Sequence, residues 1–98
     1  MQNGIGFRKI TADGAVGTSG DAQTVYGYHI QSKSTGAGVI RVYDGTSGSG
    51  TEVAEYEGVS DKGKTIDFSV GRSFANGVYI DIDDDVEYVV ICSTKNLQ

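Results

Sequence analysis

Apolar and polar residues alternate along several short stretches of this sequence, and no stretch repeats with the period of a helix. The clearest case is Lys64–Val70, where Ile66, Phe68 and Val70 are separated by polar residues. Because successive side chains of a strand point to opposite faces, this pattern predicts a strand with these three residues turned inward. The other stretches with strand character are Ile5–Thr11, Gln23–Gln31, Val39–Asp44, Thr51–Glu57, 78–83 and Val86–Cys92.

The alternation also predicts which side chains share a face. In Gln23–Gln31, Tyr26, Tyr28 and Ile30 fall on one face, and Val25, Gly27 and His29 fall on the other. In Val39–Asp44 and Thr51–Glu57 the pairs Ile40 and Val42, and Ala54 and Tyr56, are expected to share faces. In the last strand, the residues that share a face are Val86, Tyr88, Val90 and Cys92.

Glycine is abundant and proline is absent. Fifteen glycines supply tight turns, and six tyrosines with many valines and isoleucines favour strands over helices. Strands recur every 8–12 residues or so, which is typical of a sandwich or a barrel. We therefore predict an all-β fold: a two-sheet antiparallel sandwich, jelly-roll or Greek-key, with seven or eight short strands.

A chain of 98 residues has room for one domain. Within it we expect an extended N-terminal strand and flexible arm over residues 1–22, a β-sandwich core over residues 23–92, and a polar tail over residues 93–98. The stretch Ala12–Ala22 is small and polar, so it is expected to add nothing to the core.

The chain is acidic, with a formal net charge of −5 and a pI of about 4.5. No cluster of basic residues marks a nucleic-acid-binding surface, so no nucleic-acid partner is expected. No apolar run suits a signal peptide or a membrane span, and Cys92 has no second cysteine to pair with. These features predict a soluble protein made in a reducing cytoplasm, with no membrane partner.

Residues that could carry chemistry are few. His29 and Cys92 would form a nucleophile–base pair only if the fold brought them together. Asp81, Asp83, Asp84, Asp85 and Glu87 form an acidic run that lacks the spacing of a calcium loop, so a solvated turn is favoured over a cation site.

The loop Gly45–Gly50 is glycine-rich, but it lacks the lysine and the following helix of a phosphate-binding loop. Two carboxylates could in principle hydrolyse a glycoside, but the chain contains no tryptophan on which a sugar could stack. We therefore expect no enzyme activity, no catalytic, cofactor-binding or metal-binding residue, and no cofactor. Among the tyrosines, Tyr43 and Tyr79 alternate with charged residues and are expected to be exposed or half-exposed, as at protein interfaces.

Three stretches resemble small structural proteins of tailed bacteriophages. They are Thr24–Ile30, Val42–Ser47 with Gly50 and Thr51, and Ser73–Asp83, and together they cover roughly residues 23–92. The resemblance is to head decoration, or cement, proteins with a jelly-roll-like β-sandwich. It implies a virion structural protein on the capsid exterior, made in the host bacterial cytoplasm. The implied partners are the major capsid protein and further copies of the chain, as a dimer or trimer.

Two other functions stay open. One is a head-fibre or tail-associated recognition domain that binds a host surface glycan, which would need a groove with exposed aromatic residues. The other is a small hydrolase or metal-dependent enzyme, which would need polar side chains that converge on His29, Cys92 or the acidic run. On the decoration hypothesis, Met1–Gly20 is a candidate arm that lies along the capsid shell and becomes ordered on binding.

Overall fold

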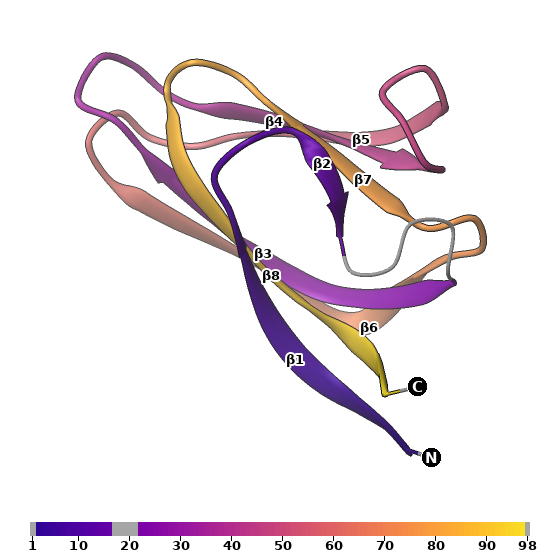
Figure 1. Cartoon of the computed structure of the whole chain (residues 1–98). Coiled ribbons are helices and arrows are strands. Elements are labelled where there is room, and N and C mark those ends of the chain that lie inside the picture. Colours follow the sequence, from indigo (N-terminus) through magenta and orange to yellow (C-terminus); the bar gives the residue numbers. More distant parts are fainter. Residues whose placement is uncertain (1, 17–21, 98) are drawn as a thin grey trace.

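The computed structural model of the chain describes residues 2–16 and 22–97, with side chains over 6–16 and 22–94. These residues form two β-sheets that face each other (Figure 1). The strands are β1 (Gln2–Ile10), β2 (Gly14–Val16), β3 (Gln23–Ser32), β4 (Val39–Asp44), β5 (Thr51–Glu57), β6 (Gly63–Phe74), β7 (Val78–Ile82) and β8 (Val86–Leu97). Along the described part of the chain, no helix is long and apolar enough to cross a membrane.

The strand order defines the topology. The first sheet runs β1-β8-β3-β6 and the second runs β2-β7-β4-β5, and all neighbouring strands are antiparallel. Eight strands in two such sheets, joined by Greek-key connections, form a jelly roll. The predicted all-β, two-sheet antiparallel sandwich is therefore confirmed.

The core lies between the sheets and consists of branched aliphatic side chains. Ile30 and Ile91 come from the first sheet, and Ile40 and Ile80 come from the second; none of the four is accessible to solvent. Smaller valines and the rings of Tyr28 and Phe74 fill the space around them. β4 and β5 have the predicted bounds and faces, with Ile40 and Val42 buried and Ala54 and Tyr56 packed against the core.

A bulge in β3 corrects the predicted faces of that strand. The pairing of β3 with β8 shifts between Val25 and Gly27, where two steps along β3 match one step along β8, so Tyr26 is an extra residue. Because one extra residue exchanges the two faces of a strand, Val25 is fully buried together with Tyr28 and Ile30, whereas Tyr26 is only half-buried. The prediction that Val25 faces away from Ile30 is wrong.

A larger irregularity lies in β6. Two steps along β3, from Val25 to Gly27, are matched by five steps along β6, from Arg72 back to Asp67. The surplus residues bulge outward, and Val70 is 77% exposed. Ile66 and Phe68 pack against the core as predicted, but the inward orientation predicted for Val70 is wrong because the bulge interrupts the alternation.

β8 also contains a shift. Ser32 pairs with Val86 and Gln31 pairs with Tyr88, so Glu87 is the extra residue. Val86 is buried, but beyond the shift the core positions are Val89 and Ile91. Tyr88, Val90 and Cys92 are half-buried, and they lie on the outer face of the first sheet. The prediction that these three share a face with Val86 does not hold across the bulge.

The N-terminal region differs from the expected arm. β1 pairs with β8 over residues 2–10, and β2 pairs with β7. Val16 is 1% exposed and belongs to the core, so the expectation that Ala12–Ala22 adds nothing to the core is wrong at this residue. Of the proposed arm, residues 17–21 lie outside the described part of the chain. At the other end, β8 continues to Leu97, in place of a tail that begins at residue 93.

Candidate protein-binding surfaces

The sandwich is open along one side, between the edge strands β5 and β6. The two strands belong to different sheets and are joined by the connection over residues 58–62. A groove of about 410 Å³ lies between them, and aromatic rings and polar or charged side chains line it together. Its lining residues are Tyr28, Asp44, Val53, Ala54, Tyr56, Phe68, Gly71, Arg72, Ser73 and Phe74.

Three aromatic rings form the centre of this groove. The ring centroid of Tyr28 lies 5.3 Å from that of Tyr56 and 5.9 Å from that of Phe68, and the latter pair meets edge to face. Such contacts hold rings in fixed positions. Burial, followed by the nearby Tyr56, raises the pKa of Tyr28 far above its ordinary range, so its hydroxyl stays protonated.

Charged and apolar groups border the same groove. The guanidinium carbon of Arg72 lies 4.9 Å from the ring centroid of Phe68, a cation–π arrangement. Among the described residues, no carboxylate lies within ion-pair distance of Arg72. Val53 and Val70 lie on β5 and β6 and are 50% and 77% exposed. Where such side chains form one contiguous patch, they mark a candidate contact surface.

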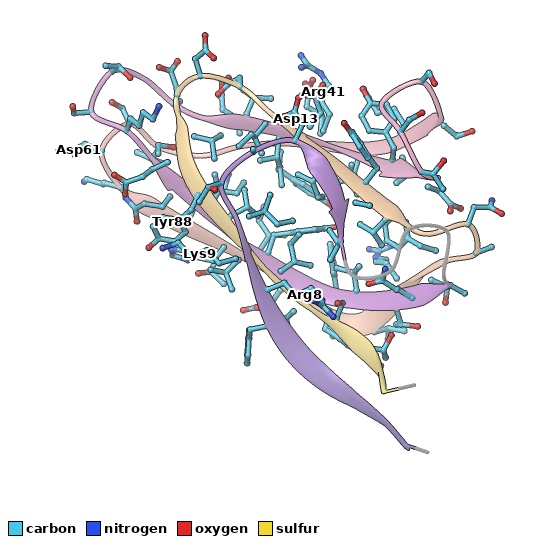
Figure 2. All side chains as sticks on the ribbon, viewed as in Figure 1. Arg8, Lys9, Asp13, Arg41, Asp61 and Tyr88 are labelled. Carbon is cyan, nitrogen blue, oxygen red and sulfur yellow. The ribbon has the colours of Figure 1, made fainter. Side chains whose placement is uncertain are left out.

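The outer face of the first sheet carries the second apolar patch. Phe7 is 76% exposed and lies opposite Cys92 in the pairing of β1 with β8. The ammonium group of Lys9 lies 4.7 Å from the ring centroid of Tyr88, and the two side chains lie beside each other in Figure 2.

His29 and Cys92, the candidate nucleophile–base pair, both lie on this face. They line one shallow depression of about 70 Å³. In the strand pairing, Cys92 lies opposite Gly27, and Val90 lies opposite His29. The imidazole Nδ1 of His29 is 2.8 Å from the hydroxyl oxygen of Thr65, which is therefore its hydrogen-bond partner. The fold thus brings the two residues to one face, but it directs His29 toward Thr65, and the absence of enzyme activity stays a prediction.

The outer face of the second sheet is acidic. Strand pairing places Arg41 between Asp81 and Glu55, and its guanidinium Nε is 2.9 Å from a carboxylate oxygen of Glu55. Six carboxylates share the face with this single cation: Asp13, Glu52, Glu55, Glu57, Asp81 and Asp83. Among the described residues, this face therefore concentrates negative charge.

Asp13 and Asp81 form a carboxyl pair at one end of the acidic face. Asp13 accepts a hydrogen bond of 2.8 Å from the backbone N–H of Ile82 (Figure 2 labels Asp13 and Arg41 on this side of the molecule). Burial raises the pKa of Asp81 above its ordinary value of 3.8, and the charge of Asp13 and a hydrogen bond to it raise it further. Arg41 opposes this shift and Asp83 adds to it.

This pair gives a pH-dependent stability prediction. A carboxyl whose pKa is raised by folding binds its proton more tightly in the folded state, so stability falls as pH rises through that pKa. Asp81→Asn is therefore expected to stabilise the protein at pH 7 by less than about 1 kcal/mol, and to lose this advantage below about pH 4. Urea unfolding at a series of pH values measures the difference.

Glu55→Gln is the matched control, because it removes the same charge from the same face. Glu55 pairs with Arg41, so this variant is expected to lose up to about 0.5 kcal/mol at pH 7. Equal shifts of the same sign for the two variants would contradict the assigned Asp13–Asp81 repulsion.

The other aspartates of the acidic run form hydrogen bonds that stabilise turns. Asp83 accepts a hydrogen bond of 3.0 Å from the backbone N–H of Asp85, and Asp85 accepts one of 2.7 Å from the hydroxyl of Thr35. Across the residues that the structure describes, no group of three or more metal-ligating side chains converges. In the loop Gly45–Gly50, Ser47 and Ser49 contact each other through their hydroxyls, 2.8 Å apart.

The tyrosines divide between core and surface differently from the expectation. Tyr43 is only 9% exposed, because it packs edge to face against Tyr79 with ring centroids 6.2 Å apart. Tyr79 is half-buried, as expected. Neither Arg72 nor Phe7 is predicted from the sequence as a surface-binding residue, and Val70 is predicted in the core. Strand alternation carries no signal for a bulge or for the exposed face of an edge strand.

Comparison with known proteins supports the fold. No family profile and no curated protein matches the chain. One similar solved structure is a chain from Bacillus endospore appendages, described as a novel family of disulfide-linked pili. The two are 17% identical, the TM-score is 0.50, and the match covers 95% of this chain and 83% of that chain. At this identity the similarity shows a shared β fold alone; it supports the predicted small sandwich and not the phage resemblance.

Proposed function

We propose that this chain is a structural protein that binds other protein surfaces as one of many copies in a large particle. The observation that carries the proposal is the placement of apolar side chains in solvent, with Phe7 on the outer face of the first sheet and Val53 and Val70 at the open side. Exposed apolar side chains grouped on one side or one face of a rigid jelly roll mark candidate contacts with other proteins.

The particle that we propose is a tailed-phage head, with the chain on its exterior as a dimer or trimer bound to the major capsid protein. The three motifs within residues 23–92 support this choice, and so does the acidic face. A concentrated charge of one sign favours encounter with a basic patch on the partner, and salt weakens such encounters.

The test is reconstitution on phage heads that lack this protein. We expect co-sedimentation to saturate at a fixed ratio of hundreds of copies per head, and the association rate to fall by roughly tenfold or more between low and high salt. Binding of only a few copies, or none, would contradict the decoration role. Deletion of residues 1–20 is a poor test of the arm, because it removes β1 and β2 from the fold.

A second candidate is the subunit of a fibrous appendage, favoured by the fold similarity to the Bacillus endospore pili. On that proposal the apolar patches join copies of the chain to one another, and an interface between unlike patches generates open filaments when the rotation between copies does not close a ring. Electron microscopy of the purified chain separates the two candidates. Filaments formed by the chain alone favour the appendage, whereas discrete dimers or trimers that bind heads favour the decoration protein.

A further inference from the structure

We propose that the groove between β5 and β6 binds an extended peptide segment of a partner protein. The segment places an apolar side chain beside Tyr56 and Phe68 and a carboxylate on the guanidinium of Arg72. This inference rests on the proposed function in one respect, because it assumes that the chain works by binding proteins.

The distribution of exposed apolar side chains favours a protein as occupant. Four large hydrophobic side chains are exposed in the described part of the chain, and three of them lie along this side: Val53 on β5, Val59 in the connection and Val70 on β6. Val53 lines the groove, and Val59 and Val70 belong to the connection and the strand that border it, which form its rims. A sugar would leave these rims in water, whereas a peptide chain with apolar side chains would cover them.

The aromatic rings supply a preformed pocket for an anchor. Tyr28 is 3% exposed and contacts the rings of both Tyr56 and Phe68, so the walls are held by core packing and need little rearrangement on binding. Binding energy at protein interfaces concentrates at such anchors, where a side chain enters a fixed pocket near aromatic and arginine residues.

Charge defines the second element of the occupant. The guanidinium of Arg72 is held over the ring of Phe68 and has no carboxylate at ion-pair distance among the described residues. A guanidinium binds a carboxylate through two parallel hydrogen bonds. Asp44 also lines the groove and accepts a hydrogen bond from the backbone N–H of Asn76. The negative charge of Asp44 would repel a second carboxylate, so we expect the peptide to carry only one, placed next to Arg72.

The width of the sandwich selects an extended chain. Facing sheets generally pack about 10 Å apart, and a helix with its side chains is about 10–12 Å across, so a helix would have to spread the two sheets in order to enter between them. An extended segment with one apolar side chain directed inward fits that space.

The experiment is an NMR titration of the full-length, nitrogen-15-labelled chain with a blocked six-residue peptide. The peptide carries one leucine and, two residues later, one aspartate among glycines. We expect amide shifts at Tyr56, Phe68 and Arg72, and an affinity roughly tenfold lower for the same peptide with asparagine in place of aspartate. Arg72→Gln should remove this preference and leave the rest of the spectrum unchanged.

Lys9→Gln is the matched control, because Lys9 is the other cation over an aromatic ring but lies on the outer face of the first sheet. It should retain the aspartate preference. No shift at the groove with millimolar peptide, shifts only around Phe7, or shifts at the groove with maltohexaose or chitohexaose but not with the peptide would each overturn the inference. Failure to bind phage heads would overturn the decoration role but would leave these peptide results unchanged.

Discussion

Replacing Ile80 by alanine is expected to lower the free energy of unfolding by about 2–5 kcal/mol. Ile80 is inaccessible to solvent and lies on β7, where it pairs with Gly14 of β2 on one side and Val42 of β4 on the other. Neighbours fixed on both sides cannot close the space that the lost atoms leave. Urea unfolding, with an unchanged dependence on urea concentration, measures the loss.

Two further variants make this result decisive. Ile80→Val removes one methylene group and is expected to cost about 0.5–1.5 kcal/mol, so it remains measurable if the alanine variant fails to fold. Val53→Ala, at a residue that is 50% exposed, should cost less than about 1 kcal/mol. Similar costs for Ile80→Ala and Val53→Ala would contradict the assignment of Ile80 to the core and Val53 to the surface.

The fold class could be predicted from the sequence because alternation with period two is a local property. Each strand needs only its own residues to show which face is apolar, and the bounds of β4 and β5 follow from the turns beside them. Strand order is not local. It depends on pairings such as Ile5 with Thr94, which no pattern within one strand contains.

The predicted faces failed at the bulges in β3, β6 and β8 for one physical reason. An extra residue reverses the two faces of everything beyond it, and the residues on either side continue to alternate without interruption. Gly71 was the available signal in β6, since a glycine within a strand often marks a bulge. A side chain at this position would collide with Thr24 and Tyr26 of β3.

The candidate binding groove could not be predicted from the sequence for a different reason. Its walls come from β3, β4, β5 and β6, and these strands come together only through the jelly-roll topology. In the sequence, Arg72 is one of several scattered basic residues, and nothing marks it as a binding residue. Its position over the ring of Phe68 depends on the bulge between the two residues. Because one fold can carry many different functions, the function has to be inferred from a local site such as this groove and not from the jelly roll itself.

Replacing Gly38 by alanine is expected to cost about 1–3 kcal/mol, although only one methyl group is added. Gly38 is buried just before β4, where its N–H donates to the hydroxyl of Ser32 and its carbonyl accepts from the N–H of Gly58. A β-carbon here would lie 2.5 Å from Cγ2 of Val86 and 3.0 Å from its Cα. The two hydrogen bonds prevent the backbone from moving away, so the clash must be relieved by moving β8.

A double-mutant cycle with Val86→Ala tests this cause. Removing the valine methyl groups should reduce the cost of Gly38→Ala by about 1 kcal/mol, and only in part, because the backbone of residue 86 still lies close to the added carbon. Gly14→Ala is the control, since nothing lies within 4 Å of its added carbon, and it should change stability by less than about 0.5 kcal/mol. If the losses of stability caused by the two substitutions simply add, the clash is not with Val86. If the loss in the double mutant is smaller than the sum, the connection between β3 and β4 packs against the start of β8, and this contact holds the two sheets together at that end.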